Sequence, residues 1–311
     1  MYYPYLRGKQ FELIALREFS KETPTPSHVC PIIEPVKSSF NGLKAAIEAL
    51  SGKKISFALV LNPSDGDFKR EHQDILANLP SLKELVGWIP AFIYRGTGRY
   101  IETYIAANSL NDVMIIFQDS IDLSKEDVSQ LLKNNSVKYV VANIEGDRRN
   151  RRLLARSGKE LIRLDDQFHE QPRNADYLSI PEEKFTEEHR YYSEDGYKGF
   201  ADYVTLPSSF KESGMLPYAV AIHMTYQKNE DEIFVRHFVS DHNSDNTNIP
   251  GKFYEAATKL KKFYSGIQGT QASSELIAIL DANRYPGLGV LKKLSIKNHL
   301  ELIENYLTQQ K

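Results

Sequence analysis

Carboxylates directly follow several short apolar runs in this 311-residue chain, a position from which they could do acid–base chemistry. The clearest is Glu34, which follows two isoleucines and precedes a proline in the stretch PIIEP. Apolar neighbours would desolvate this carboxyl group, which suits a general acid. A structural salt bridge to Arg7 is the alternative role, and the sequence leaves both open.

A second candidate lies in the stretch IRLDDQFHEQPRNADY (162–177), where an apolar run ends in the adjacent carboxylates Asp165 and Asp166. We expect this stretch to form the rim of an active site, with Asp165 as an acid or base, rather than a solvated turn. Asp119, Glu145 and Asp165 end three consecutive runs, and neighbouring carboxylates could hold Mg²⁺ or Mn²⁺, which prefer oxygen ligands. No HxH or HExxH spacing supports a metal site, so solvated strand ends are the alternative.

Basic residues in two places could hold an anionic substrate. Arg7 and Lys9 follow the first apolar run, and the segment EGDRRNRRLLAR (145–156) brings Arg148 and Arg149 to the start of a predicted helix. Arginines at a helix N-terminus can bind phosphate through paired hydrogen bonds that add to the helix dipole. The sequence therefore predicts phosphate or nucleic-acid contact there, with a solvated run of charges as the alternative.

Two histidines, His223 and His237, lie on two alternating runs within residues 218–241. Alternation places each histidine on a partly apolar strand face, where the pair could act as acid and base or be purely structural. The loop SDHNSDNTN that follows has acidic residues spaced like the start of a calcium loop. It carries Asn246 and Lys252 where such loops need glycine and glutamate, so we expect no calcium site there.

The elements that must position these residues alternate between short apolar runs and amphipathic helical segments. Eight runs are predicted strands, at residues 2–7, 29–35, 55–62, 88–94, 113–119, 138–145, 161–165 and 202–207. Several are apolar at consecutive positions, as in strands covered on both faces, and strands that alternate with helices favour a parallel sheet. The sequence predicts a (β/α)8 TIM-like barrel. An open doubly wound sheet is less favoured because no glycine-rich phosphate loop follows the first strand.

The alternation is interrupted after the seventh and eighth strands. A long insertion precedes residue 202, and a second insertion contains a predicted β-hairpin at residues 218–241. The helix at residues 251–266 is expected to close the barrel. We expect one domain, with the barrel over about residues 1–265 and a helical extension over about 266–311. Loops after strands form the catalytic face of such barrels, so polar residues there are expected to converge. They are Arg7, Lys9, Glu34, Asn62, Arg95, Asp119, Glu145, Asp147, Asp165, Asp166 and Asp202.

Composition excludes several classes of protein. The formal net charge of −2 gives no global attraction to nucleic acid or anionic membranes, so such contact would need a local basic patch. Cys30 is the only cysteine, which excludes an internal disulfide and a thiolate-rich metal site, and its apolar neighbours predict a buried thiol. No stretch approaches the roughly 20 apolar residues that cross a bilayer, so we expect a cytoplasmic protein without a membrane partner.

Three segments, MYYPYLRGKQFELIALRE (1–18), LDDQFHEQPRNADY (164–177) and the motifs from GYKGFADYVTL to GKFYEA (196–256), together resemble a poorly characterised bacterial family. We group it with the phage and bacterial "beta protein" families, and the resemblance spans nearly the whole chain. Members are often encoded beside a restriction-nuclease-like protein, which implies a role in phage defence and such a protein as partner. The matching positions are Arg7, Gly8, Lys9, Asp165, Phe168, Arg173, Asn174, Asp176, Tyr177, Gly199, Asp202, Tyr203, His223, Tyr226, His237 and Asp241.

The sequence leaves two main functions open. The first is a hydrolase or lyase for a phosphorylated or nucleotide-like substrate, favoured by analogy with other barrels that have polar mouths. Its catalytic candidates are Glu34, Asp165 and His223, and its anion-binding candidates are Arg7, Lys9, Arg148, Arg149, Asp202, Tyr226 and His237. The second is a non-catalytic module that binds the nuclease-like protein through residues 209–250. Direct DNA binding is a third interpretation and rests on the arginine run alone.

Overall fold

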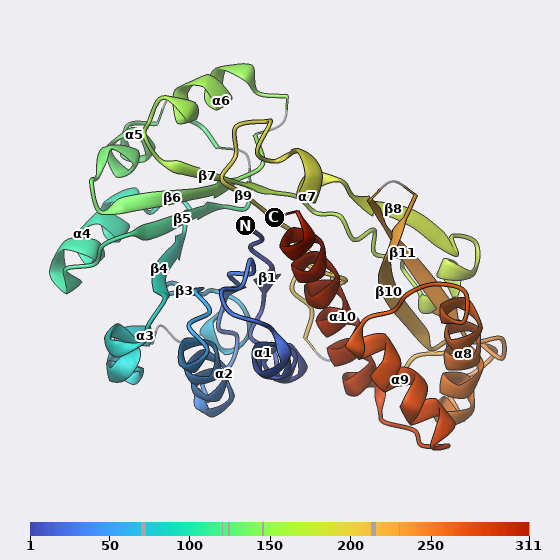
Figure 1. The fold of residues 1–311 in the computed structure, drawn as a ribbon. Coiled ribbons are helices and arrows are strands. Elements are labelled where there is room, and N and C mark those ends of the chain that lie inside the picture. The colour runs from blue at the N-terminus through green and yellow to red at the C-terminus, as the bar shows by residue number, and fades with distance from the viewer. Residues whose placement is uncertain are drawn as a thin grey trace. The chain divides into compact units, whose positions relative to one another are not determined.

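The computed structural model describes residues 1–69, 73–119, 121–123, 125–144, 146–212, 216–229 and 231–310. Its contacts divide the chain into two compact units, which are described separately (Figure 1). The barrel unit comprises Met1–Lys9, Pro24–Asp165 and Glu188–Asp202, and the hairpin unit comprises Gln10–Thr23, Asp166–Glu187 and Tyr203–Lys311. That the chain is a single domain stays a prediction.

Eight parallel strands form the sheet of the barrel unit. In chain order, which is also their order in the sheet, they are β1 (Tyr5–Leu6), β2 (Ile32–Ile33), β3 (Phe57–Val60), β4 (Trp88–Ile93), β5 (Val113–Phe117), β6 (Val137–Ala142), β7 (Glu160–Leu164) and β9 (Gly199–Ala201). Tyr2 makes parallel bridges to both Val29 and Phe200, and the Tyr3 N–H donates to the Phe200 carbonyl at 2.8 Å. These contacts bring the last strand beside the first. The sheet is therefore a nearly closed (β/α)8 TIM-like barrel, as predicted.

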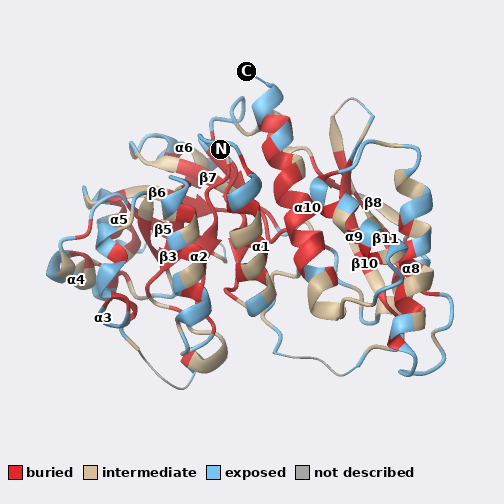
Figure 2. Ribbon diagram, turned by 60° about the horizontal axis from the view of Figure 1, so that its bottom comes forward, coloured by how far each residue is buried: buried red, intermediate tan, exposed pale blue. Residues whose placement is uncertain are grey.

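Helices follow most strands of the barrel unit. They are α2 (Asn41–Gly52), α3 (Ile75–Asn78), α4 (Gly98–Asn108), α5 (Glu126–Lys133), α6 (Arg148–Ala155) and α7 (Glu188–Tyr191), with 3₁₀ turns η1 (Gly66–Lys69) and η2 (Pro80–Glu84). In α2 the buried residues Leu43, Ala46, Ile47 and Leu50 recur at three- and four-residue spacing and form one apolar face. Strands such as β5 are buried along their whole length, since a barrel strand is covered on both faces (Figure 2).

The hairpin unit combines a three-stranded antiparallel sheet with helices. Its elements are α1 (Gln10–Glu22), η3 (Asn174–Leu178), β8 (Glu182–Thr186), β10 (Ala221–Lys228), β11 (Glu232–Val239), α8 (Ile249–Tyr264), α9 (Gln271–Asp281) and α10 (Leu288–Gln309). The strand order is β10-β11-β8, so the predicted hairpin is confirmed as β10 and β11. Its core joins Ile222 and Met224 of β10 to Phe253 and Leu260 of α8 and Leu276 of α9.

Two predicted elements differ from the structure, and one observed strand was not predicted. The eighth barrel strand is β9 rather than residues 202–207, because the chain turns directly after it. Val204 has a φ of 51°, and the Leu206 N–H donates to the Tyr203 carbonyl at 3.1 Å. The helix predicted to close the barrel is α8, whose apolar face packs on β10 and β11 of the hairpin unit. The sequence also fails to predict β8, a charged segment that pairs with β11.

Two features predicted from composition concern Cys30 and membrane spans. Cys30 is buried, as predicted, and burial raises the pKa of its thiol to about 12. A thiol held protonated in this way is a core side chain rather than a nucleophile. None of the described helices is long and apolar enough to cross a membrane.

Candidate functional site

A polar side chain lies at or near the carboxyl end of each strand in the barrel unit, the end at which barrel enzymes bind their substrates. We call these residues the barrel mouth; they are Arg7, Glu34, Asn62, Arg95, Gln118, Asn143, Asp165 and Asp202. The structure joins several of them into two clusters, one around Glu34 and one around Asp165. Polar strand ends were predicted, and the contacts show which of them meet.

Glu34 is fully buried, with a side-chain exposure of 0%, and its carboxylate has neighbours on both oxygens. The Tyr5 hydroxyl donates to Oε2 of Glu34 at 2.7 Å. Gln118, which follows β5 on the opposite side of the barrel, donates from Nε2 to that hydroxyl at 3.1 Å. Arg7 Nε lies 3.7 Å from Oε2, and Arg95 Nη2 lies 3.5 Å from Oε1. The structure thus shows the salt bridge to Arg7, and Glu34 could reach a substrate only if this cluster opened.

The two arginines of the barrel mouth already form ion pairs with carboxylates. Arg7 forms a second ion pair with Asp65, and its side chain is 11% exposed. Arg95 is more open, at 34%, and its Nη1 donates to the Asn62 carbonyl at 3.2 Å. Lys9, also predicted to bind an anion, is half-buried. Anion binding at the mouth stays a prediction, with Arg95 as its most accessible cation among these three.

Like Glu34, Asp165 has side-chain partners on both carboxylate oxygens. Its Oδ2 accepts from Arg163 Nε at 2.6 Å and its Oδ1 from Asn143 Nδ2 at 3.0 Å, and Arg163 also pairs with Glu188 at 3.2 Å. Asp202 is 2% exposed and accepts from the Tyr2 hydroxyl at 2.6 Å, so it contacts the barrel core instead of solvent. Burial, and then the charge of Asp202, raise the pKa of Tyr2.

The predicted metal ligands do not form a described cluster. Asp119 is exposed and Glu145 lies outside the described residues. Among the residues that the structure describes, no group of three histidine, cysteine or carboxylate side chains is arranged to hold a metal ion. β5 ends at Phe117 and β6 ends at Ala142, so the first residue after each strand is an amide, Gln118 or Asn143. The predicted strands extended further, to the carboxylates Asp119 and Glu145. A Mg²⁺ or Mn²⁺ site stays a prediction.

Sequence reasoning missed several residues of these clusters. Tyr5, Gln118, Asn143 and Arg163 were not singled out, although each contacts a predicted carboxylate or its partner. The available signal was position, since Gln118 and Asn143 are the first polar residues after long apolar runs. Gln118 and Asn143 were missed because the predicted strands extended past them, to residues 119 and 145.

The hairpin unit contains the histidine pair. In the register of β10 and β11, His223 lies directly opposite His237, and the two Nδ1 atoms are 2.7 Å apart. His237 Nε2 lies 3.2 Å from Oε1 of Glu183 on β8, and the other oxygen of Glu183 lies 2.7 Å from Nδ1 of His169. The Tyr177 ring packs on both histidines, with centroids 4.7 and 4.4 Å away. Four titratable side chains therefore form one chain of contacts.

These contacts determine which ring nitrogens carry protons. The Glu183 carboxylate accepts, so His237 donates to it through Nε2–H and presents an unprotonated Nδ1. His223 then donates from Nδ1 and keeps a lone pair on Nε2. Burial, with smaller effects from His237 and Lys292, lowers the pKa of His223 to about 3. Burial also lowers the pKa of His237, against the effect of Glu183, so both rings are neutral at pH 7.

A cavity of about 260 Å³ lies beside His223 within the hairpin unit. Its polar lining includes His223, Asn174 and Thr205, and Lys292 and Ser295 come from α10. The Lys292 side chain is exposed, whereas Ser295 is buried. Since Nδ1 of His223 is taken by His237, its Nε2 is the ring nitrogen that a ligand in the cavity could use.

Tyr226 does not belong to this site. Strand alternation places it on the opposite face of β10 from His223. Its hydroxyl donates to Glu182, which also pairs with Lys228 and, at 3.0 Å, with Arg236. Although burial opposes the effect, the hydrogen bonds from Lys228 and Tyr226 lower the pKa of Glu182. The prediction that Tyr226 binds an anion therefore finds no support in its contacts.

Comparisons with known proteins returned no match: no protein-family model, no curated protein and no solved structure. Membership of the beta protein families therefore stays a prediction.

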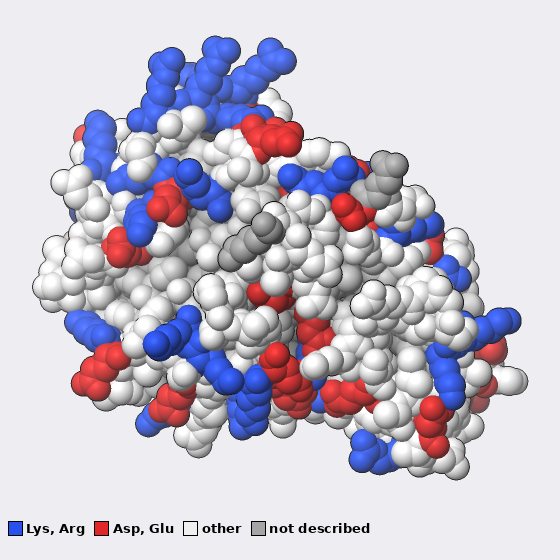
Figure 3. All heavy atoms as spheres, in the orientation of Figure 1, with Lys and Arg blue, Asp and Glu red and all other residues white. Residues whose placement is uncertain are grey.

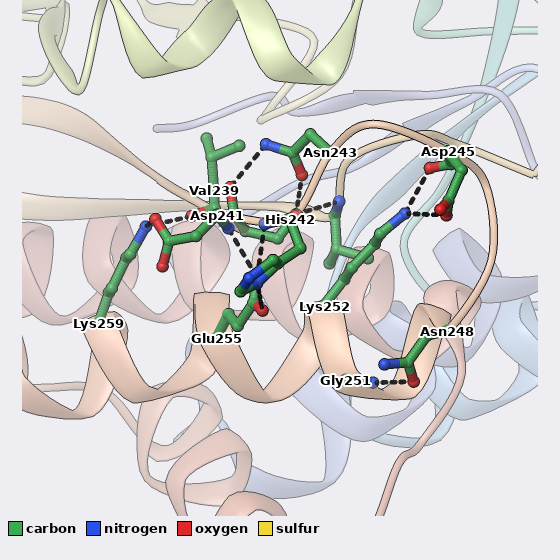
Figure 4. A network of polar contacts seen from close by, with 12 residues as sticks. Val239, Asp241, His242, Asn243, Asp245, Asn248, Gly251, Lys252, Glu255 and Lys259 are labelled. Atoms are coloured by element: carbon green, nitrogen blue, oxygen red, sulfur yellow. Dashed lines mark hydrogen bonds and ion pairs between the residues drawn. The ribbon is translucent and has the colours of Figure 1, made fainter.

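The acidic residues Asp241 and Asp245, in the loop after β11, form ion pairs with lysines of α8 (Figure 4). Asp241 pairs with Lys259 at 2.7 Å, and Asp245 pairs with Lys252 at 3.5 Å. Glu255 accepts the backbone N–H groups of Asp241 at 2.7 Å and His242 at 3.1 Å. The loop carboxylates thus pair with lysines of α8, and Glu255 of α8 binds the loop backbone, so the loop is fastened to α8.

Acid is expected to destabilise the protein through the histidine pair. The folded pKa of His223, about 3, lies below its ordinary value near 6.5, so the unfolded chain binds more protons between these values and stability falls as pH falls. Between pH 6.5 and 4.5 we expect a loss of about 2 kcal/mol in the free energy of unfolding. Urea unfolding of the wild type and of His223→Gln measures it, since the variant should lose this pH dependence.

His242→Gln is the control for that experiment, because its side chain is 87% exposed. It should change the pH dependence much less than His223→Gln does. Equal slopes for the wild type and His223→Gln would contradict the burial of a neutral His223.

Proposed function

We propose that this chain is an enzyme that uses His223 as a general base on a phosphorylated or nucleotide-like substrate. The observation that carries the proposal is the chain from Glu183 through His237 to His223, which ends at a cavity. In a hydrolase or a lyase, a general base can remove a proton from water or from the substrate. An unprotonated Nε2 beside a cavity suits that step.

The low pKa of His223 does not prevent such a role. When Nε2 takes a proton, Nδ1 can pass its own to His237 Nδ1, and His237 Nε2–H can pass to Oε1 of Glu183. Each ring ends neutral and the negative charge of Glu183 is lost, so no imidazolium forms in the pair. His169 is 65% exposed beside the second oxygen of Glu183 and can exchange the proton with water.

The substrate class is supported by the lining of the cavity. The exposed ammonium of Lys292 gives the cavity a positive charge, while Asn174, Thr205 and Ser295 offer hydrogen bonds. An anion there could also accept a hydrogen bond from the Nε2–H that His223 carries after the proton transfer. A cavity of about 260 Å³ accommodates a small phosphorylated molecule or part of a nucleotide.

A panel of p-nitrophenyl phosphate, bis(p-nitrophenyl) phosphate and nucleotides tests the proposal. His223→Ala is expected to lower kcat on the order of 100-fold, the usual contribution of a general base. Lys292→Ala should mainly raise KM, because the ammonium holds the substrate in the ground state as well. Lys262→Ala, an exposed lysine outside the cavity lining, is the matched control. No turnover by the wild type, or equal turnover by His223→Ala, would refute the role of His223.

The biological setting is part of the proposal and rests on the resemblance to the beta protein families. It would place the enzyme in the cytoplasm, in phage defence, beside a nuclease-like partner.

A second candidate function is a docking module for that partner, because Leu216 and Tyr218 are 60% and 58% exposed within the region predicted to bind it. Co-purification with the partner that depends on these two side chains, without any turnover, would favour the second candidate.

A further inference from the structure

Helix α6 of the barrel unit exposes a row of arginines that the proposed active site does not use. Arg148, Arg149, Arg152 and Arg156 are all exposed, and we call them the arginine surface (Figure 3). No described residue forms a hydrogen bond or ion pair with any of the four. Arg151 differs, since its Nη2 donates to the Asp195 carbonyl at 2.6 Å and its guanidinium lies over the Tyr197 ring.

The opposite side of α6 fixes the helix to the barrel unit. Leu154 is 1% exposed, and the buried Asn150 donates to the Ile121 carbonyl at 2.7 Å. Asp147 caps the helix by accepting the Asn150 N–H at 2.9 Å. Arg148 and Arg152, four residues apart, lie in line along the exposed side with one helical turn, about 5.4 Å, between them. The cations are therefore presented by an anchored helix.

Helix stability does not explain this row. Like charges four residues apart oppose each other by about 0.2–0.5 kcal/mol a pair, and two such pairs link Arg148, Arg152 and Arg156. Arg148 and Arg149 also lie in the first turn, where the helix dipole disfavours cations. The formal net charge of the protein is −2, so the row is a local feature. An anionic partner would reverse each of these unfavourable terms.

We propose that the arginine surface binds the sugar–phosphate backbone of nucleic acid without reading its sequence. The guanidinium fork matches phosphate oxygens in pairs, and contacts to phosphate carry no base information. A membrane surface fits less well. An interfacial helix inserts an apolar face, whereas the apolar side of α6 is buried and Leu153, at 46%, is its exposed large apolar residue.

Fluorescence anisotropy with labelled single-stranded and duplex DNA of 20 nucleotides or base pairs, between 50 and 300 mM salt, tests the proposal. With about four phosphates engaged, log K should fall with log salt with a slope near −3 for the single strand and slightly steeper for the duplex. Replacing all four arginines by glutamine should bring the slope close to zero and weaken binding at least about tenfold at 50 mM salt.

The control variant is Lys21→Gln/Lys53→Gln/Lys262→Gln/Arg284→Gln, which removes four exposed cations outside α6. It should bind DNA with nearly the wild-type slope, and unfolding curves of both variants establish that they fold. Absence of DNA binding at 50 mM salt, or equal slopes in the two quadruple variants, overturns the proposal. Binding to vesicles of anionic lipid without binding to DNA overturns it as well. Because the proposed active site lies in the hairpin unit, none of these outcomes bears on the role of His223.

Discussion

A Lys297→Met variant is expected to lose about 3–5 kcal/mol in the free energy of unfolding, as when one partner of a buried ion pair is removed. The Lys297 side chain is 3% exposed, and its Nζ lies 2.6 Å from Glu22, 3.5 Å from Glu275 and 3.7 Å from Glu301. These carboxylates come from α1, α9 and α10 of the hairpin unit. Without the ammonium, the three carboxylates at this junction of three helices keep one lysine of those described, Lys293, which lies 3.0 Å from Glu275.

The loss should shrink as pH falls. Burial already raises the pKa of Glu301, and removing Lys297 takes away an interaction that lowers it. A carboxyl group whose folded pKa lies above its unfolded value, near 4.3, gains protons on folding, so the difference in stability between the variant and the wild type narrows as pH falls from 7 towards 5. Urea unfolding at pH 7 and pH 5 measures both effects.

Lys261→Met is the matched control, because Lys261 and Asp281 form an ion pair in which both side chains are about half exposed. Exposed pairs contribute about 0–1 kcal/mol, and this variant should show little pH dependence. A Lys297→Met variant as stable as Lys261→Met would mean that the carboxylates around Lys297 are solvated or protonated.

The barrel could be predicted because its signals are local. β3 (FALV) and β5 (VMIIF) are apolar at consecutive positions, and α2 repeats apolar residues at helical spacing, so each element is visible in a short window. The hairpin was visible for the same reason. β8 was not, because its sequence EEKFT is charged and it pairs only with β11, at the edge of the small sheet. Edge strands commonly carry charge, which hides them from a search for apolar runs.

The residues of the candidate sites were harder to predict than the elements. Two predicted strands were two or three residues too long, so the prediction selected Asp119 and Glu145 instead of Gln118 and Asn143. In a strand, a shift of one residue places the side chain on the other face. The histidines were found, but their partner Glu183 lies 54 positions from His237 on the unpredicted β8. Pairing over such distances depends on tertiary packing, which local periodicity does not encode.

A Glu34→Gln variant is expected to lose about 3 kcal/mol in the free energy of unfolding, near the lower end for a broken buried pair. Glutamine keeps the shape of Glu34 but removes the charge that Arg7 and Arg95 share. The loss stays near the lower end because Arg7 keeps Asp65 as a partner and Arg95 is 34% exposed. Urea unfolding of the variant measures it.

Two controls and one ligand sharpen this test. Tyr5→Phe removes the hydrogen bond to Glu34 but leaves the charge of Glu34 in place, and should lose only about 1 kcal/mol in the free energy of unfolding. Glu48→Gln lies in an exposed pair with Lys44 and should change that free energy by less than about 0.5 kcal/mol. If the mouth binds anions, phosphate should stabilise Glu34→Gln more than the wild type, because the variant leaves Arg95 without its carboxylate. Equal stability of Glu34→Gln and the wild type would show that the two arginines do not depend on this carboxylate, and the cluster would then contribute little to closing the barrel mouth.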